Sequence, residues 1–186
     1  MKHRYLLMLA PLFLSACIEP GDVKPTSRLQ AHLPADAHMT ANGTWLASGK
    51  VVSVSDGDTV TVLGSNKQQY KIRLQGIDAP EKTQPFGQKC KEDLLTRAVN
   101  LDGTVEAKKL DRYGRIVGKV RVNGTDIALE QIKAGCAWYY ADYAKELSVA
   151  DREAYTAAEK AARKAKRGLW KDNNPQAPWD FRKTQK

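Results

Sequence analysis

Five charged residues, spread over three short segments, carry the chemistry that this sequence suggests. They are Asp58 in DGDT, Arg73, Asp78 and Glu81 in RLQGIDAPE, and Arg115 in DRYGR. If the segments converge in the fold, three carboxylates meet two guanidinium groups. Carboxylates bind hard metal ions, and guanidinium groups bind phosphate oxygens through a planar fork of donors. The set is therefore suited to the metal-assisted cleavage of a phosphodiester.

Strands are expected to position the first of these residues. Apolar and β-branched residues fill positions 50–54 and 59–63 around Asp56-Gly57, which predicts a tight hairpin. Apolar and polar residues then alternate over positions 70–75. This alternation predicts a strand that points Arg73 away from its core face.

Two further strands are predicted at residues 104–110 and 116–122, joined through DRYGR. Apolar residues at helical spacing and capping residues predict helices over residues 85–100, 125–134 and 148–168. This order of elements predicts an α+β fold. Its core is a short barrel of about five strands, accompanied by three helices; partly open barrels of this kind often bind oligonucleotides on one face.

Each site residue has an ordinary explanation when it is taken alone. Asp58 could belong to the hairpin turn, and Asp78 before Pro80 could form another turn. Arg73 and Arg115 could form surface ion pairs. The conjunction favours a site, because two aspartates at strand ends can face one hard cation.

The composition is consistent with one domain and two tails. With 186 residues, of which 42% are hydrophobic, the chain can bury a core. We expect the domain over residues 44–172 and a C-terminal tail over residues 173–186. The formal charge of +9 favours a polyanionic partner, because a basic surface attracts phosphate-rich ligands. This argument is weak alone, since many basic proteins bind no nucleic acid.

Residues 1–16 have the pattern of a secretory signal: a positive start, an apolar stretch and a small-residue exit. Leu14-Ser15-Ala16-Cys17 resembles the bacterial lipobox, which predicts that Cys17 carries lipid chains. Residues 17–43 contain prolines without clear periodicity and are interpreted as a flexible tether. We expect an exported lipoprotein anchored in the outer membrane or cell envelope. The alternative is ordinary cleavage after Ala16, which leaves a periplasmic or secreted protein.

Two cysteines remain after such processing, Cys90 and Cys136. An even pair in an oxidising compartment is allowed to form a disulfide. The alternative interpretation is two small, buried apolar side chains.

From about Lys50 to Trp170, the three segments and the order of elements resemble the staphylococcal nuclease (thermonuclease) family. The resemblance implies a barrel of the oligonucleotide-binding (OB) type and a Ca²⁺-dependent nuclease that acts on DNA and RNA and leaves 3′-phosphate ends. It implies that Asp58, Asp78 and the backbone carbonyl of Ala79 bind the ion. The family usually has threonine where this chain has Ala79, so the hydroxyl group is missing here.

The same resemblance assigns the other roles. Glu81 orients or deprotonates the attacking water, and Arg73 and Arg115 stabilise the charge of the transition state. Arg112, Tyr113 and Tyr143 contact the bound nucleotide. Single strands are the expected preference, because unstacked bases can reach aromatic side chains. We expect a monomer; the alternative function is a non-catalytic, nucleic-acid-binding lipoprotein module.

Overall fold

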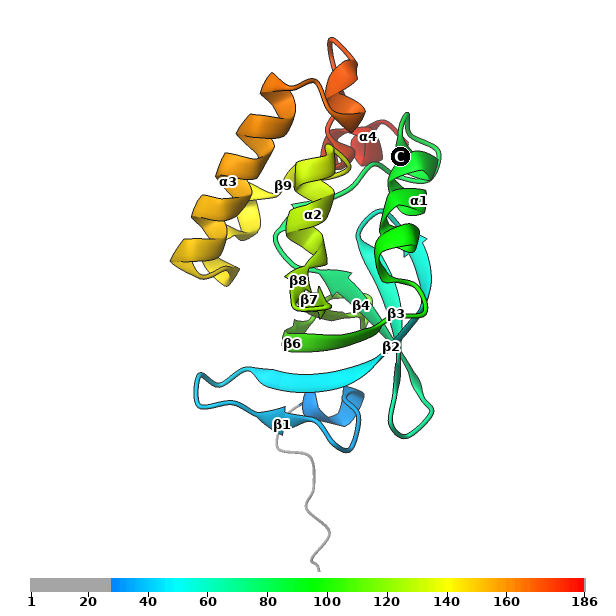
Figure 1. Cartoon of the computed structure of the whole chain (residues 1–186), viewed down its shortest axis with the longest axis vertical. Helices are drawn as coiled ribbons and strands as arrows, with labels where there is room; N and C mark the ends of the chain where they lie inside the picture. Colours follow the sequence, from blue (N-terminus) through cyan, green and yellow to red (C-terminus); the bar gives the residue numbers. More distant parts are fainter. Residues whose placement is uncertain (1–27, 186) are drawn as a thin grey trace, which may run out of the picture.

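Five strands close into a barrel at the centre of the computed structural model, which describes residues 28–185 (Figure 1). They are β2 (Trp45–Asp56), β3 (Thr59–Gly64), β4 (Gln69–Leu74), β6 (Asp102–Leu110) and β7 (Ile116–Val122). Neighbours pair in the order β2, β3, β4, β7, β6, and β6 pairs back onto β2. Strands β4 and β7 run parallel, and the other barrel pairs are antiparallel. This arrangement confirms the predicted α+β fold with a five-stranded, OB-type barrel.

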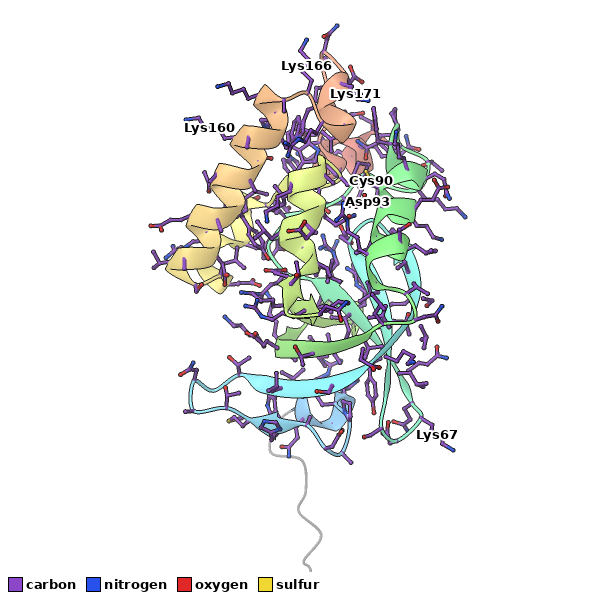
Figure 2. The ribbon with its side chains drawn as sticks, viewed as in Figure 1. Lys67, Cys90, Asp93, Lys160, Lys166 and Lys171 are labelled. Atoms are coloured by element: carbon purple, nitrogen blue, oxygen red, sulfur yellow. The ribbon has the colours of Figure 1, made fainter. Side chains whose placement is uncertain are left out.

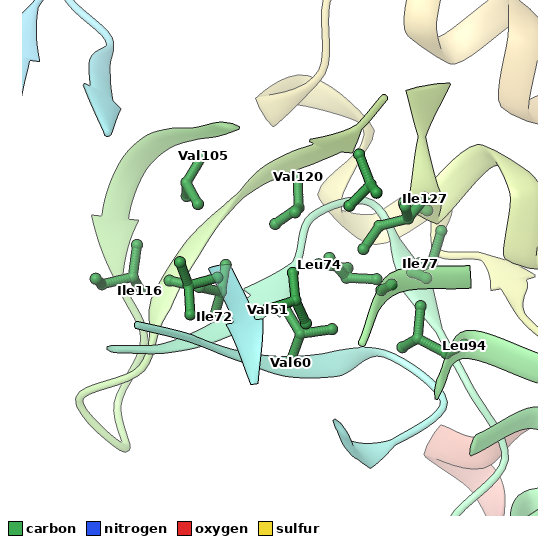
Figure 3. Close-up of a cluster of buried hydrophobic side chains, with 14 of the residues drawn as sticks. Val51, Val60, Ile72, Leu74, Ile77, Leu94, Val105, Ile116, Val120 and Ile127 are labelled. Carbon is green, nitrogen blue, oxygen red and sulfur yellow. The ribbon is translucent and has the colours of Figure 1, made fainter. Parts of the chain in front are cut away.

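The strands fill the barrel with aliphatic side chains (Figure 3). In β4, Ile72 and Leu74 are buried, whereas Lys71 is exposed and Arg73 is only partly covered on the opposite face. Burying an aliphatic side chain of this size stabilises a fold by about 1.5–3 kcal/mol. The alternation therefore fixes which face of β4 meets the core, and it places Arg73 on the opposite, outer face.

Three helices lie together at one end of the barrel (Figure 1). They are α1 (Gly87–Ala98), α2 (Ile127–Ala134) and α3 (Val149–Lys164). In α1, the buried residues Cys90, Leu94 and Ala98 recur every four positions, as an amphipathic helix requires. The three helices predicted from the sequence are confirmed, with ends that differ by a few residues.

The helix ends have clear chemical causes. Asp126 caps α2 by accepting hydrogen bonds from two backbone N–H groups, and Gly135 ends the helix with a φ of 70°. Ser148 caps α3 by accepting from the N–H of Asp151. Helix α3 then ends at Lys164, and Gly168 begins a separate short turn.

Smaller elements complete the chain. They are η1 (Gln30–His32), β1 (His38–Met39), β5 (Ile77–Asp78), β8 (Thr125–Asp126), β9 (Trp138–Tyr139), η2 (Ala141–Glu146), η3 (Gly168–Lys171) and α4 (Pro178–Thr184). Strands β5 and β9 pair with each other as a separate ribbon. Helix α4 is a fourth α-helix, and it lies in the segment that was predicted to be only a tail.

The segment before residue 44 also differs from its prediction. From residue 28 onward it is not a free tether, because β1 pairs with β2 and both Leu29 and Leu33 are buried in the main core. The proline and glycine content of the segment led to the prediction of a tether, and it did not indicate that these apolar side chains are buried. Residues 1–27, with the predicted signal peptide and Cys17, lie outside the described residues.

Cys90 and Cys136 are both buried and free, so the structure does not contain the disulfide that the sequence allowed. The two thiols contact each other, and their hydrogen bond together with burial raises the pKa of Cys90. No helix within residues 28–185 has both the length and the apolar character needed to cross a membrane.

A basic cluster, comprising Lys160, Arg163, Lys164, Lys166 and Arg167, is exposed at the C-terminal end of α3. Figure 2 shows Lys160 and Lys166 at the end of the molecule opposite β1. Arg163 lies over the ring of Trp170, 3.8 Å from its centroid, so the stem of this side chain is used in packing. The cluster otherwise forms a solvated face.

Candidate active site

One guanidinium group joins the two aspartates that come from different strands. Nη2 of Arg73 lies 3.1 Å from Oδ2 of Asp58 and 3.0 Å from Oδ1 of Asp78. Arg73 is the penultimate residue of β4, Asp58 lies in the turn between β2 and β3, and Asp78 ends β5. The predicted convergence of these segments is therefore present in the structure.

The turn that carries Asp58 is held from behind. Gln131 of α2 is fully buried and donates to the carbonyls of Gly57 and Cys90, at 2.9 and 3.0 Å. In front, the N–H of Ala79 donates to Oδ2 of Asp58 at 2.9 Å. A Cβ atom added to Gly57 would lie 2.7 Å from the Cβ of Ala79. The two segments thus approach so closely that Gly57 has no room for a side chain.

Glu81 follows Ala79 in a loop that hydrogen bonds with Gln84 stabilise. Its N–H donates to Oε1 of Gln84 at 3.1 Å, and its carbonyl accepts from the backbone N–H of Gln84 at 2.9 Å. A Cβ at Gly87 would lie 1.9 Å from that carbonyl oxygen. The Glu81 side chain remains 38% exposed, so it faces the pocket and can reach water.

Arg115 is placed by a different set of partners. Its Nε donates to Oδ2 of Asp111 at 2.6 Å, and its Nη1 donates to Oγ1 of Thr59 at 3.4 Å. Thr59 in turn donates to Oδ1 of Asp58 at 3.0 Å. Burial alone would raise the pKa of Asp111, but the hydrogen bonds from Arg115 outweigh it and hold that pKa below its ordinary value. Arg115 is thus connected to Asp58 through one hydroxyl group.

Burial and neighbouring charges raise the pKa of two carboxyl groups of the site, those of Asp56 and Asp78. Burial, together with the neighbouring charge of Asp58, raises the pKa of Asp56 from 3.8 to about 6. Burial also raises the pKa of Asp78, although hydrogen bonding and charge from Arg182 and Arg73 oppose the shift. A cation bound beside these carboxylates would favour their ionised form.

The site opens into a pocket of about 670 Å³. Its lining includes every predicted catalytic and metal-binding residue and the three predicted nucleotide contacts, Arg112, Tyr113 and Tyr143. Tyr113 and Tyr143 are 69% and 44% exposed, so their rings are accessible to a ligand. Tyr140 lies beside Tyr143 with ring centroids 4.9 Å apart.

The donor atoms suit a hard cation. Asp58 and Asp78 present carboxylate oxygens toward a common point, marked by the shared nitrogen of Arg73. Within residues 28–185 no three His, Cys, Asp or Glu side chains form a metal-binding group. A cation here would therefore combine two carboxylates with backbone, water or substrate oxygens, an all-oxygen set of the kind that Ca²⁺ prefers.

Three residues of the site escaped prediction. Asp56 and Thr59 stand in the predicted DGDT motif, and their proximity to Asp58 was the available signal. Arg182 of α4 had no such signal. It donates from Nη2 to Oδ2 of Asp78 at 2.8 Å and from Nη1 to Oε1 of Glu81 at 2.7 Å.

A closed five-stranded barrel that gathers carboxylate and guanidinium groups in one open pocket defines a protein of the OB-fold class. More specifically, the chain belongs to the staphylococcal nuclease family: a family model described as "Staphylococcal nuclease homologue" matches residues 71–172.

Known relatives are found in bacteria and plants. An "Uncharacterized endonuclease" of Haemophilus influenzae is 39% identical over 137 residues, which cover 74% of each chain. The "Micrococcal nuclease" of Shigella flexneri is 37% identical over 147 residues, covering 74% of this chain and 82% of the relative. An "Uncharacterized 38.1 kDa protein" of Capnoides sempervirens is 41% identical over 119 residues, 64% of this chain but 33% of the relative. The chain thus spans about a third of that longer plant protein.

Proposed function

We propose that this chain is a Ca²⁺-dependent nuclease that hydrolyses phosphodiester bonds in DNA and RNA. The observation that carries the proposal is the convergence of Asp58, Asp78, Arg73 and Glu81 on one open pocket. Family membership and relatives named as nucleases support it.

Asp58, Asp78 and the backbone carbonyl of Ala79 would hold the ion. A bound cation at this point supplies Lewis-acid polarisation of a phosphate oxygen. The ligand set contains a backbone carbonyl, which does not depend on the side chain at position 79. The replacement of the family's usual threonine by Ala79 therefore leaves the ligand in place.

Glu81 would position the attacking water and accept its proton, because its carboxylate faces the pocket beside the aspartates. A positioned base of this kind contributes about 10²–10⁴-fold to a rate. Arg73 and Arg115 would donate to the phosphate oxygens as these gain charge in the transition state. Attack in line with the P–O5′ bond expels the 5′ oxygen and leaves a 3′-phosphate end.

The aromatic side chains of the pocket would bind the bases. Stacking on an exposed ring contributes about 1–3 kcal/mol per base and does not depend on sequence. Tyr143 would stack on a base, while Arg112 and Tyr113 would contact the terminal phosphate. Single strands are the preferred substrate, because their bases are free to leave the stack and reach these rings.

Digestion of heat-denatured DNA by the purified full chain tests the proposal. We expect fragments with 3′-phosphate ends in the presence of Ca²⁺ and no cleavage in excess chelator. A protein that retains DNA in a binding assay without cutting it is the non-catalytic module, and cleavage that a chelator does not affect excludes the metal-dependent mechanism.

We also propose that the chain is exported as a monomeric, lipid-anchored protein of the outer membrane or cell envelope. The support is the lipobox-like segment that ends at Cys17. Metabolic labelling with a fatty acid should mark the wild-type protein, and Cys17→Ser should remove the label. Labelling that survives this substitution excludes Cys17 as the anchor, while release of an unlabelled wild-type protein indicates the periplasmic or secreted alternative.

A further inference from the structure

Arg182 occupies the two carboxylates that the proposed reaction needs most. Its Nη2 lies 2.8 Å from Oδ2 of Asp78, and its Nη1 lies 3.2 Å from Oδ1 of Asp78 and 2.7 Å from Oε1 of Glu81. Asp78 is 2% exposed, so little of its carboxylate remains open to other partners. One guanidinium group thus joins a proposed metal ligand to the proposed base.

The hydrogen bonds from Arg182 to Asp78 and Glu81 are incompatible with the proposed metal binding and water activation for as long as they are formed. A carboxylate whose two oxygens both accept from guanidinium groups offers poor coordination to a cation. Positive charge beside Asp78 also repels a second cation at the same point. The hydrogen bond from Arg182 also occupies Oε1 of Glu81, so this oxygen is not available to a water molecule.

Arg73 contacts the same aspartates but is held differently. It belongs to barrel strand β4, its side chain is 15% exposed, and its Nη1 also donates to the carbonyl of Leu74 at 2.7 Å. Arg182 has a side chain that is 43% exposed, and it donates hydrogen bonds to Asp78 and Glu81. Of the two guanidinium groups, Arg182 is therefore the one that can withdraw.

Helix α4 is attached beside the site by polar and aromatic contacts, which include an edge-on contact of Trp179 with Trp138 at 5.7 Å. Nε2 of Gln84 donates to the carbonyl of Gln176 at 2.6 Å, and the ring of Trp179 stacks on Tyr140 at 4.9 Å with an angle of 6°. The segment between η3 and α4, residues 172–177, is largely exposed. The family model matches residues 71–172, so α4 lies beyond the matched residues.

We propose that α4 is a built-in closing element, in which Arg182 holds the cation position of the free site and leaves it when Ca²⁺ binds. This inference rests on the proposed function, because it concerns the same carboxylates. Closure and calcium binding then compete. The apparent affinity for calcium is reduced by the fraction of molecules that are closed, and calcium weakens the docking of α4 by the same factor.

Calcium binding by an Arg182→Gln variant tests the competition without any substrate. Binding is measured as the rise of the melting temperature of the purified full chain over a calcium titration, because a ligand of the native state stabilises it. We expect Arg182→Gln to bind Ca²⁺ about 5–150-fold more tightly than the wild type, the usual range for coupled equilibria.

Lys183→Gln is the matched control. Lys183 is the next residue of α4, carries the same charge and pairs with Asp180 instead of the site. Its substitution should leave the calcium affinity at the wild-type value. If Lys183→Gln gained as much calcium affinity as Arg182→Gln, the loss of one positive charge anywhere on α4 would explain the effect. That result would overturn the proposal.

Hydrogen exchange gives an independent measure of the opening of α4. The N–H groups of Asp180 and Phe181 both donate to the carbonyl of Ala177. In the wild type their exchange should become faster as calcium saturates the site. Calcium binding by Arg182→Gln that is equal to or weaker than that of the wild type would overturn the proposal, and so would hydrogen exchange in α4 that calcium leaves unchanged. In either case the proposed function would still stand if the wild type binds calcium and cleaves DNA. Absence of calcium binding in all three proteins would overturn both.

Discussion

The N–H of Ala79 donates a hydrogen bond to Oδ2 of Asp58 across 21 positions of the sequence, at 2.9 Å. This bond fixes the turn after β2 against the end of β5, where Asp78 lies. It also directs one carboxylate oxygen of Asp58 toward the segment that would supply the carbonyl ligand. The distance between the two motifs is thereby set by a backbone N–H and a buried side chain.

Asp58→Asn should separate folding from metal binding. Asparagine keeps a side-chain oxygen for the N–H of Ala79, so the fold should persist, but it removes the negative charge that a cation requires. We expect the calcium-dependent rise in melting temperature to disappear. Asp102→Asn, at an exposed position outside the site, should retain the rise. An unchanged calcium effect in Asp58→Asn would exclude Asp58 as a ligand.

Gly57→Ala should destabilise the protein by about 1–3 kcal/mol, the usual cost of overpacking. The added Cβ would lie 2.7 Å from the Cβ of Ala79 and 3.3 Å from that of Cys90. Adding Ala79→Gly removes the first of these contacts, so the double variant should regain part of the stability. Strictly additive effects in denaturant unfolding would show that the two positions do not meet.

Sequence reasoning located the motifs because their chemistry is local, and it missed what depends on tertiary contacts. Asp58, Arg73 and Asp78 were expected together because two aspartates at strand ends can face one cation and because the motifs resemble those of the staphylococcal nuclease family. Nothing in residues 173–186 indicates that Arg182 reaches Asp78. That contact exists because α4 packs through Trp179 against Tyr140.

The N-terminal error has a similar origin. Leu29 and Leu33 stand in a segment rich in proline and glycine, which predicts a tether. Their burial depends on contacts with the main core and on the pairing of β1 with β2, and neither is visible in the local pattern.

Arg115→Lys should lower kcat about 10²–10³-fold, the effect of removing one donor to a developing charge. Lysine is a point charge and cannot reproduce the fork that Asp111 and Thr59 orient. Arg112→Lys should act mainly on KM, because Arg112 is exposed and is assigned to nucleotide binding. Steady-state kinetics on a single-stranded oligonucleotide separates the two effects, and equal losses in kcat for both variants would contradict these roles.

Asp151→Asn should destabilise the protein by about 1.5 kcal/mol at neutral pH, the value for a partly exposed bond to a charged group. Asp151 accepts from the buried ammonium group of Lys119 at 2.6 Å. Burial alone would raise the pKa of Asp151, but bonds from Lys119 and Ser148 outweigh it and lower that pKa below 3.8.

The sign of the pH dependence follows from this lowered pKa. The unfolded chain binds a proton at Asp151 more readily than the folded chain does, so the carboxylate adds stability above about pH 4. This stability is lost as the pH falls through the lower pKa of the folded state. The difference between wild type and Asp151→Asn should therefore shrink below about pH 4 in urea unfolding curves. A difference that is constant from neutral to acidic pH would contradict the assignment.

The most direct test of the proposed mechanism is the cleavage rate of Glu81→Gln on a single-stranded oligonucleotide at saturating Ca²⁺. Glutamine preserves the size of the side chain but cannot accept the proton of water, so we expect a loss of about 10²–10⁴-fold in the single-turnover rate. Glu92→Gln, on the exposed face of α1, should cleave at the wild-type rate. A fully active Glu81→Gln protein would contradict the account.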